Sequence, residues 1–222
     1  MFPLSDLKTH HARVNRWIIA INILVFLWVM LVSGGYLGQQ SINLLEKQIP
    51  YLVFTPAVFS EDPVQGVVSL FGSMFMHAGI LHLLGNMWFL WVFGDNIEDH
   101  LGSFRYLMFY LAGGIAAALT ETYMGGDPGL SMVGASGAVA AVLGAYLVIL
   151  PRAWIRTYLP PIFIFHVPAY IYLPYWAIVQ YFSILAGEAG VAFYAHLGGF
   201  VFGFVAMLLL RRRPTSPVTH PS

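Results

Sequence analysis

The sequence predicts an all-α membrane protein with six transmembrane helices, and its composition, the length of its apolar segments and the placement of its charges each support this fold class. Of its 222 residues, 59% are hydrophobic and only 9% are charged, whereas about 25% of a soluble domain is charged. The length fits a single domain. Because the net charge is zero and cysteine is missing from the sequence, we expect no nucleic-acid partner, no disulfide framework and no thiolate chemistry.

Six apolar segments have lengths suited to spanning helices. They are Trp17–Ser33, Ser73–Phe93, Phe104–Tyr123, the short Ser136–Leu150, Val167–Ala186 and Val191–Leu210. We therefore divide the chain into an N-terminal tail (1–16), a membrane domain (17–210) and a C-terminal tail (211–222).

Two stretches between these segments differ from simple connectors. The stretch 34–72 carries charges and several prolines, and a connection of this length is expected to be functional or packed. We interpret it as an outer loop with some amphipathic structure. Tyr158–His166 contains Pro160 and Pro161, so we expect an extended or interfacial stretch there rather than a helix.

The positive charges predict the orientation. With the N-terminus in the cytoplasm, nine of the ten Lys and Arg residues fall on the inner side and only Lys47 falls outside. Cytoplasmic segments of membrane proteins are enriched in these residues. Both termini are therefore expected in the cytoplasm, and the second, fourth and sixth segments run from outside to inside. The inner residues are Lys8, Arg13, Arg16, Arg105, Arg152, Arg156, Arg211, Arg212 and Arg213.

A serine and a histidine occur at similar depth in two of these segments. A helix rises about 1.5 Å per residue, so Ser136 lies roughly 24 Å above the inner marker Arg152, and His196 lies roughly 22 Å above Arg211. Polar groups inside a membrane are costly and are therefore functional candidates. Nucleophilic catalysis by a serine requires at least its hydroxyl and a base that takes the proton.

The second segment places two more polar side chains at nearly the same level. His82 lies roughly 24 Å above Glu98, and Asn86 follows one helical turn below His82 on the same face. Three helices thus bring four polar side chains together several ångströms below the outer boundary of a hydrocarbon core of about 30 Å.

Small residues indicate which helices touch. Such residues at four-residue spacing allow close approach of helix backbones in a membrane, and if the two stripes face each other, Ser136 and His196 lie side by side. The stripes are Gly137, Ala141 and Ala145 on the fourth segment and Ala195, Gly199 and Gly203 on the sixth.

Three motifs, in order, resemble those of the rhomboid family of intramembrane serine proteases. The motifs are Gly134-Ala135-Ser136-Gly137, His77-x4-His82-x3-Asn86 and Ala195-His196-x2-Gly199-x3-Gly203. The resemblance covers roughly residues 69–210 and implies a six-helix rhomboid-like bundle. It also implies that Ser136 is the nucleophile and His196 the general base and acid.

Each candidate residue has a structural alternative. Ser136 has the alternative of a helix N-cap, and His196 that of a buried histidine bonded to a carbonyl. Asn86 and His82 are the expected oxyanion donors, with interhelical hydrogen bonding as the alternative. His77 is expected to pin the first loop.

The glycines of the motifs have expected structural roles. Gly199 and Gly203 are expected to be packing residues. Gly134 and Gly137 either allow a tight helix entry and close approach of a substrate backbone or simply end the loop.

The sequence departs from the family pattern at two places. Many rhomboids carry Trp-Arg where this chain has Val68 and Ser69, and some carry a tyrosine where it has Ala140. The second departure leaves the support of the His196 ring unassigned. Glu121 and Glu188 are expected near the outer helix ends, so we predict a Ser–His dyad rather than a triad with a carboxylate.

The sequence therefore predicts an intramembrane serine endopeptidase that cuts transmembrane segments of other membrane proteins, with partners restricted to such substrates and the bilayer. Neither metal nor cofactor is expected, and no H-E-x-x-H of a zinc protease occurs. An intramembrane aspartyl protease is not expected either, because Asp127 has no aspartate partner at membrane depth. The alternatives are an inactive rhomboid-like protein for membrane-protein binding or quality control, and a small transporter. The expected location is a bacterial inner membrane. Substrate, cleavage site and oligomeric state stay open.

Overall fold

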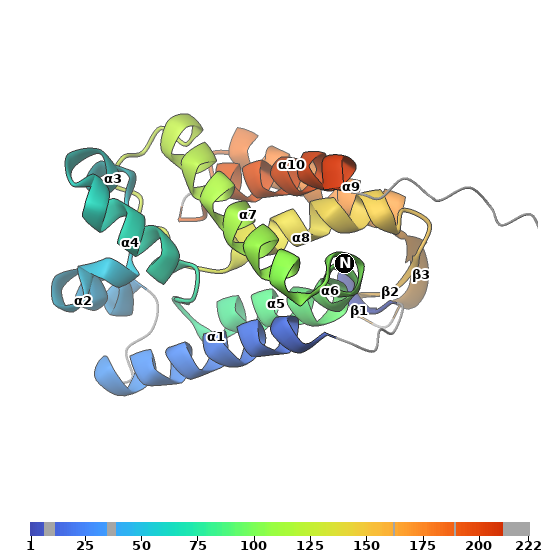
Figure 1. The fold of residues 1–222 in the computed structure, drawn as a ribbon, viewed down its shortest axis with the longest axis horizontal. Helices are drawn as coiled ribbons and strands as arrows, with labels where there is room; N and C mark the ends of the chain where they lie inside the picture. Colours follow the sequence, from blue (N-terminus) through green and yellow to red (C-terminus); the bar gives the residue numbers. More distant parts are fainter. Residues whose placement is uncertain (7–11, 35–38, 162, 189, 211–222) are drawn as a thin grey trace, which may run out of the picture.

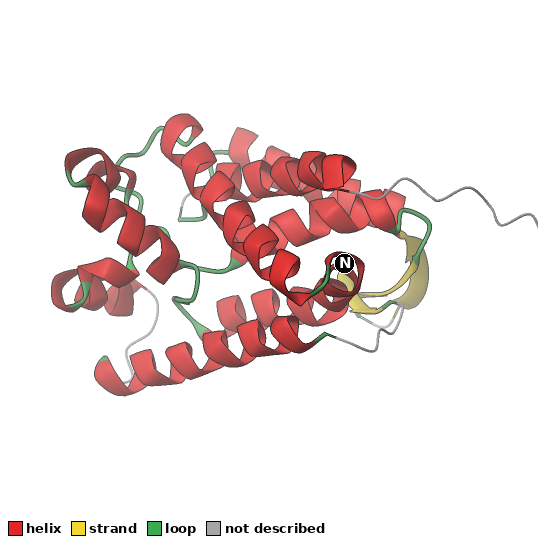
Figure 2. Cartoon of the chain, in the orientation of Figure 1, coloured by secondary structure: helices red, strands yellow, loops and turns green. Residues whose placement is uncertain are grey.

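The computed structural model describes residues 1–6, 12–34, 39–161, 163–188 and 190–210. Helices pack side by side around a central helix, with a small sheet at one end of the bundle (Figures 1 and 2). In chain order the elements are β1 (Phe2–Ser5), α1 (Arg13–Val32), α2 (Gln39–Gln48), a 3-10 turn (Pro50–Leu52), α3 (Pro56–Glu61), α4 (Pro63–Ser73), α5 (Ile80–Phe89), a π-helical turn (Leu90–Gly94), α6 (Asp95–Leu101), α7 (Ser103–Met124), α8 (Ser136–Ile149), β2 (Trp154–Leu159), β3 (Phe163–Pro168), α9 (Ala169–Leu185) and α10 (Phe193–Leu210).

Each of the six apolar segments forms a helix. In the second segment the helix begins only at Ile80, and α5 continues through the π-helical turn into α6 beyond the end of the segment. In the described part of the chain, α1 and α10 are long and apolar enough to cross a membrane by length and composition, and α8 is a shorter apolar helix. The helical character predicted from the sequence is therefore confirmed.

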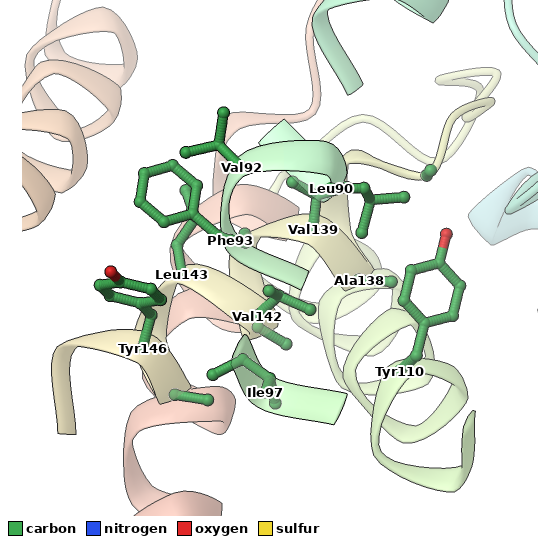
Figure 3. Packing of buried hydrophobic residues seen from close by; sticks show 14 of the residues in the cluster. Leu90, Val92, Phe93, Ile97, Tyr110, Ala138, Val139, Val142, Leu143 and Tyr146 are labelled. Carbon is green, nitrogen blue, oxygen red and sulfur yellow. The ribbon is translucent and has the colours of Figure 1, made fainter. Parts of the chain in front are cut away.

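Helix α8 forms the centre of the bundle. Every residue from Gly137 to Tyr146 is buried, as expected for a helix that is apolar all round. Figure 3 shows its side chains packed against the π-helical turn, α6 and α7. The rings of Tyr146 and Phe93 meet edge to face, with centroids 5.0 Å apart. The first residue of α8 is thus carried by the most enclosed element of the molecule.

The π-helical turn is stabilised by a side chain from α1. A π-turn leaves a backbone carbonyl without its ordinary helical partner, and Asn15 Nδ2 donates to Leu90 O over 2.8 Å. Asn15 Oδ1 in turn accepts from Tyr106 Oη at 2.7 Å. A Cβ at Gly94 would lie 2.3 Å from Asn15 Oδ1, so glycine is needed for this close approach.

Glu98 of α6 binds the beginning of α1. Its carboxylate accepts the N–H groups of Arg13, Val14 and Asn15 at 3.1, 2.9 and 2.7 Å. These N–H groups have no partner within their own helix. Ser103 Oγ of α7 also donates to Glu98, over 2.6 Å. One carboxylate therefore joins α1, α6 and α7.

The prediction of an all-α fold needs one correction, because the strands form an antiparallel sheet in the order β1-β2-β3. The expected extended stretch Tyr158–His166 lies in β2 and β3, where Leu159 pairs with Phe163. The N-terminal residues, which we assigned to a tail, add a third strand, with Phe2 opposite Tyr158. Strand β1 was missed because four residues are too few to show a strand pattern in the sequence, and because its partner lies far along the chain.

The first outer loop is more regular than expected. Its described part contains α2, a 3-10 turn, α3 and α4. Thr55 caps α3 through Val58 N, and Asp62 caps α4 through Val64 N and Gln65 N, in both cases before a proline at the start of the helix. Such a cap followed by proline is a helix-start signal in the sequence.

The loop packs against the bundle, as its length predicted. Phe54, Leu70, Met74 and Ala118 form one apolar cluster that joins α4 to α7. Phe54 also forms a β-bridge with Met132, just before α8. The loop therefore helps to hold the entry to α8 in place.

The described ends of the chain lie toward the same end of the bundle. Strand β1 and the last turn of α10 lie toward the sheet, and α2, α3 and α4 lie at the opposite end (Figure 1). Lys8 and Arg211, Arg212 and Arg213, which entered the charge count, fall outside the described residues.

Candidate active site

Ser136 is the first residue of α8 and does not cap it. The N-cap is Ala135, and α8 has no side-chain cap hydrogen bond. The alternative role of Ser136 as an N-cap is therefore excluded. The N–H groups of the first helical turn have no partner within the helix, and they carry the positive end of the helix dipole. They are available to bind an anion beside the hydroxyl of Ser136.

Gly134 brings the approach to α8 close to the His82 ring. Its φ of +129° lies in the region that favours glycine. A Cβ at this position would lie 2.8 Å from both Cε1 and Nε2 of His82, and 3.7 Å from Ser136 Oγ. Gly134 N also donates to Ser73 O over 2.9 Å. Gly134 is thus required by its conformation and by the space that the His82 ring takes, so it does more than end a loop.

The two small-residue stripes face each other. A Cβ at Gly199 of α10 would lie 2.2 Å from Gly137 O, and a Cβ at Gly203 would lie 1.9 Å from Ala141 O. The backbones of α8 and α10 are therefore in direct contact, as the spacing predicted. A Cβ at Gly137 would lie 3.9 Å from Ala195 O. Ser136, one residue before Gly137, and His196, one residue after Ala195, both line the cavity described below.

The His196 ring is held by residues of α9 that the sequence reasoning did not single out. His196 Nδ1 lies 2.7 Å from Gln180 Oε1. The centroid of the Trp176 ring lies 6.1 Å away, at an interplanar angle of 39°. Phe193, one turn earlier on α10, meets the ring edge to face at 6.1 Å. The sequence did contain a signal for Gln180, because it is a polar residue in the middle of an apolar segment. Polar groups at membrane depth are functional candidates.

Ala140 is important for the packing of α8 against α10 and not for the support of the His196 ring. It is fully buried, and its Cβ would lie 3.3 Å from a Cβ at Gly199. A larger side chain would separate α8 from α10. Trp176 and Phe193 therefore supply the aromatic contacts to His196 that a tyrosine supplies in some rhomboids.

Glu121 lies near the end of α7, as expected. It is buried, and its Oε2 accepts the N–H of Ala195 over 2.8 Å. A carboxylate at the beginning of a helix satisfies free N–H groups and interacts favourably with the dipole. Glu121 thus fixes the beginning of α10, one residue before His196, through the backbone and not through the ring.

Helix α5 contributes the remaining polar residues. Asn86 is buried, and its Nδ2 donates to His82 O over 3.1 Å, which leaves the second N–H of the amide for another acceptor. The rings of His77 and His82 meet edge to face with centroids 5.1 Å apart. His77 is itself buried, in keeping with the structural role expected for it.

These side chains line one cavity of about 580 Å³. Its walls include Ser136, His196, Asn86, His82 and Gln180. The four polar residues that the depth argument placed at one level are therefore brought together by α5, α8 and α10. A cavity of this size is large enough for an extended stretch of peptide or for several water molecules.

The first departure from the family pattern, at Val68 and Ser69, lies outside the lining of this cavity. Val68 and Ser69 belong to α4. Ser69 is fully buried and its Oγ donates to Gly66 O over 3.0 Å, whereas Val68 is half-exposed. Neither residue lines the cavity, so the absence of Trp-Arg leaves the reacting groups in place.

Comparison with known proteins gives consistent matches. The Rhomboid domain family matches residues 64–213. "Rhomboid protein 1, mitochondrial" of Saccharomyces cerevisiae is 30% identical over 213 residues, which is 90% of this chain and 54% of that protein. "Presenilin-associated rhomboid-like protein, mitochondrial" of Homo sapiens is 30% identical over 199 residues, 86% of this chain and 46% of that protein.

A bacterial relative matches a shorter stretch. "Rhomboid protease GluP" of Bacillus subtilis is 40% identical over 72 residues, 32% of this chain and 14% of that protein. The chain spans about half the length of the two mitochondrial relatives. The family match covers the three motifs and most of the residues that line the cavity. The chain belongs to the rhomboid family, whose members are integral membrane proteins.

Proposed function

We propose that the chain is an intramembrane serine endopeptidase that uses a Ser136–His196 dyad. Rhomboid family members are in general intramembrane serine proteases, and one relative carries the name of a protease. The observation that carries the proposal is the placement of Ser136 at the uncapped beginning of α8, in the same cavity wall as His196.

The arrangement supports a stepwise acyl transfer. His196 Nε2 takes the proton of Ser136 Oγ as the oxygen attacks the scissile carbonyl carbon. The resulting oxyanion is stabilised by N–H groups at the beginning of α8, with Asn86 and His82 as side-chain donors. The protonated His196 then gives its proton to the departing amine. Water, activated by the same ring, hydrolyses the acyl ester and restores Ser136.

The position of Ser136 in a cavity wall restricts the substrate. Peptide bonds within a helix are shielded, so a transmembrane substrate has to unwind locally before its carbonyl reaches Ser136. We therefore propose transmembrane segments of other membrane proteins as substrates, with preference for helix-weakening or small residues near the cut. Six spans with both termini in the cytoplasm complete the proposal, because the charge count and the shared end of the described termini agree with it.

The proposed location is a bacterial inner membrane. The alternative is a mitochondrial membrane, since the printed names of two relatives include the word mitochondrial. Fractionation of the source cells, followed by antibody detection of the chain, distinguishes the two.

Labelling by a fluorophosphonate probe tests the activity. We expect the purified, folded protein to be labelled and Ser136→Ala to lose the label completely. Ser131→Ala is the matched control, because Ser131 lines the same cavity and its Oγ donates to Glu46; its labelling should be retained. Absence of labelling in the folded protein would favour the inactive binding protein or the transporter.

A further inference from the structure

Gln180 is a polar side chain in an otherwise apolar part of α9. Its neighbours on the helix, Val179 and Tyr181, are exposed on the surface of the bundle, but Gln180 points into the cavity. There its Oε1 lies 2.7 Å from His196 Nδ1. A polar group is costly inside a membrane. The contact with His196, the proposed base, accounts for a polar residue at position 180.

The contact decides which ring nitrogen carries the hydrogen. In neutral histidine one ring nitrogen is a donor and the other is an acceptor. The amide oxygen of Gln180 can only accept, so this contact is a hydrogen bond only in the tautomer in which Nδ1 bears the hydrogen and Nε2 holds the free lone pair. A general base needs that lone pair on the side of the nucleophile. When the ring becomes doubly protonated, Nδ1–H continues to donate to the same oxygen.

Trp176 fixes the plane of the same ring. It lies four residues before Gln180 and therefore on the same face of α9. The Trp176 ring contacts both His196 and Phe200, with centroids 6.1 and 5.9 Å apart. One face of α9 thus holds the ring of His196 by a hydrogen bond and by an aromatic contact, while Glu121 holds the backbone beside it.

We propose that Gln180 is a positioning residue that holds His196 in the Nδ1–H tautomer and directs Nε2 toward Ser136. The inference rests on the proposed function and deepens it, because it gives the dyad a third, uncharged member. The neutral amide of Gln180 would hold His196 in one tautomer, as the aspartate of a serine protease triad holds its histidine. It does so without placing a carboxylate against the His196 ring.

The first experiment reads the tautomer directly and does not require activity. The full chain, labelled with 15N-histidine, is purified in detergent, and the His196 resonances are assigned by their loss in His196→Ala. At a pH where the ring is neutral, we expect the Nδ1–H pattern in the wild type. Gln180→Leu, which has a similar volume and no acceptor, should populate the Nε2–H form, and Gln180→Glu should retain Nδ1–H. An unchanged tautomer in Gln180→Leu would overturn the proposal.

The second experiment measures the consequence for Ser136. Gln180→Leu should slow fluorophosphonate labelling about 10- to 100-fold, the range expected for a misdirected base, and Gln180→Glu should restore most of the rate. With a transmembrane substrate, kcat should fall and KM should stay unchanged. Tyr181→Leu is the matched control, since this neighbour is exposed on the surface, and it should label at the wild-type rate.

The two experiments separate the possible failures. If the wild type is not labelled, the proposed function fails, and the NMR spectra still decide whether Gln180 sets the tautomer. If the wild type is labelled and Gln180→Leu labels equally fast with unchanged thermal stability, the positioning role alone is wrong.

Discussion

Ser136 and His196 acquire their proposed chemistry from small local features of the backbone. Ser136 is the first helical residue behind Ala135, so its hydroxyl is not used as a cap and the N–H groups of the first turn stay available. Gly134 lets the chain turn into α8 against the His82 ring. The reactive groups are therefore placed by a helix start and a positive φ, and no unusual side chain is needed.

Ser136→Ala and His196→Ala should each abolish cleavage of a transmembrane substrate and leave the fold intact, because both remove few atoms at a cavity wall. Since nucleophile and base act as one unit, the double variant should be no worse than either single variant. The measurement is kcat/KM for the three variants, with thermal unfolding as the control for folding. Two partial losses that multiply in the double variant would contradict the dyad.

Asn86→Ala should lower kcat by about 10²-fold, in line with loss of one oxyanion donor. KM should change little, because the donor acts on charge that develops in the transition state. Steady-state kinetics on a transmembrane substrate measure both constants. A raised KM with normal kcat would show that Asn86 only holds substrate or supports α5 through His82 O.

At the scale of elements, the contact between α8 and α10 carries the site. Backbone atoms of the two helices touch at Gly199 and Gly203, so the relative position of Ser136 and His196 follows from packing and not from a direct bond. Glu121 and Gln180 then fix the beginning of α10 and the ring of His196 from two further helices, α7 and α9.

Gly199→Val should inactivate the protein although Gly199 does no chemistry. Its Cβ would fall 2.2 Å from the backbone oxygen of Gly137, and a backbone atom cannot move aside without moving its helix. Overpacking typically costs about 1–3 kcal/mol, and a shift of about 1 Å at the site can cost roughly 100-fold in rate. Thermal stability and activity should therefore fall together.

Leu208→Val is the control for this substitution. Leu208 lies on the same helix, off the stripe and partly exposed, so stability and activity should stay close to those of the wild type. Full activity in Gly199→Val would mean that the backbone contact between α8 and α10 does not position the dyad.

At the scale of the whole molecule, the site occupies one region of the bundle and a polar network stabilises another. Glu98, Asn15 and Tyr106 join α1, α6 and α7. Helix α6 and the beginnings of α1 and α7 lie toward the end of the bundle that carries the sheet (Figure 1). None of the three lines the cavity of Ser136. Loss of this network is therefore expected to change stability without changing the proposed chemistry.

Glu98→Ala should reduce the stability of the fold without affecting the chemistry. It leaves several N–H groups at the beginning of α1 without their acceptor, and each hydrogen bond to a charged group contributes about 1.5–3 kcal/mol. Thermal unfolding in detergent should occur at a clearly lower temperature, while fluorophosphonate labelling of the remaining folded protein keeps its rate. Asp99→Ala, next to it and exposed, should leave the unfolding temperature unchanged.

Several features of the molecule could be predicted from the sequence because their causes are local. The length and apolar character of the six segments determine that they form helices. Glycine and alanine at four-residue spacing specify the contact of α8 with α10, because only small side chains allow backbones to touch. The motif residues Ser136, His196, His82 and Asn86 could be placed at one level from the rise of a helix alone.

The tertiary structure decided the features that depend on residues far apart in the chain. Strand β1 exists because β2, more than a hundred and fifty residues later, offers it an edge. Gln180 and Glu121 meet α10 from two other helices, and no spacing rule within one helix relates them to His196. The sequence by itself thus predicted which groups can react and at what depth they lie. The packing of α7, α9 and α10 decided what orients them, since a hydrogen bond between helices depends on their mutual rotation, which is determined only when the whole bundle packs.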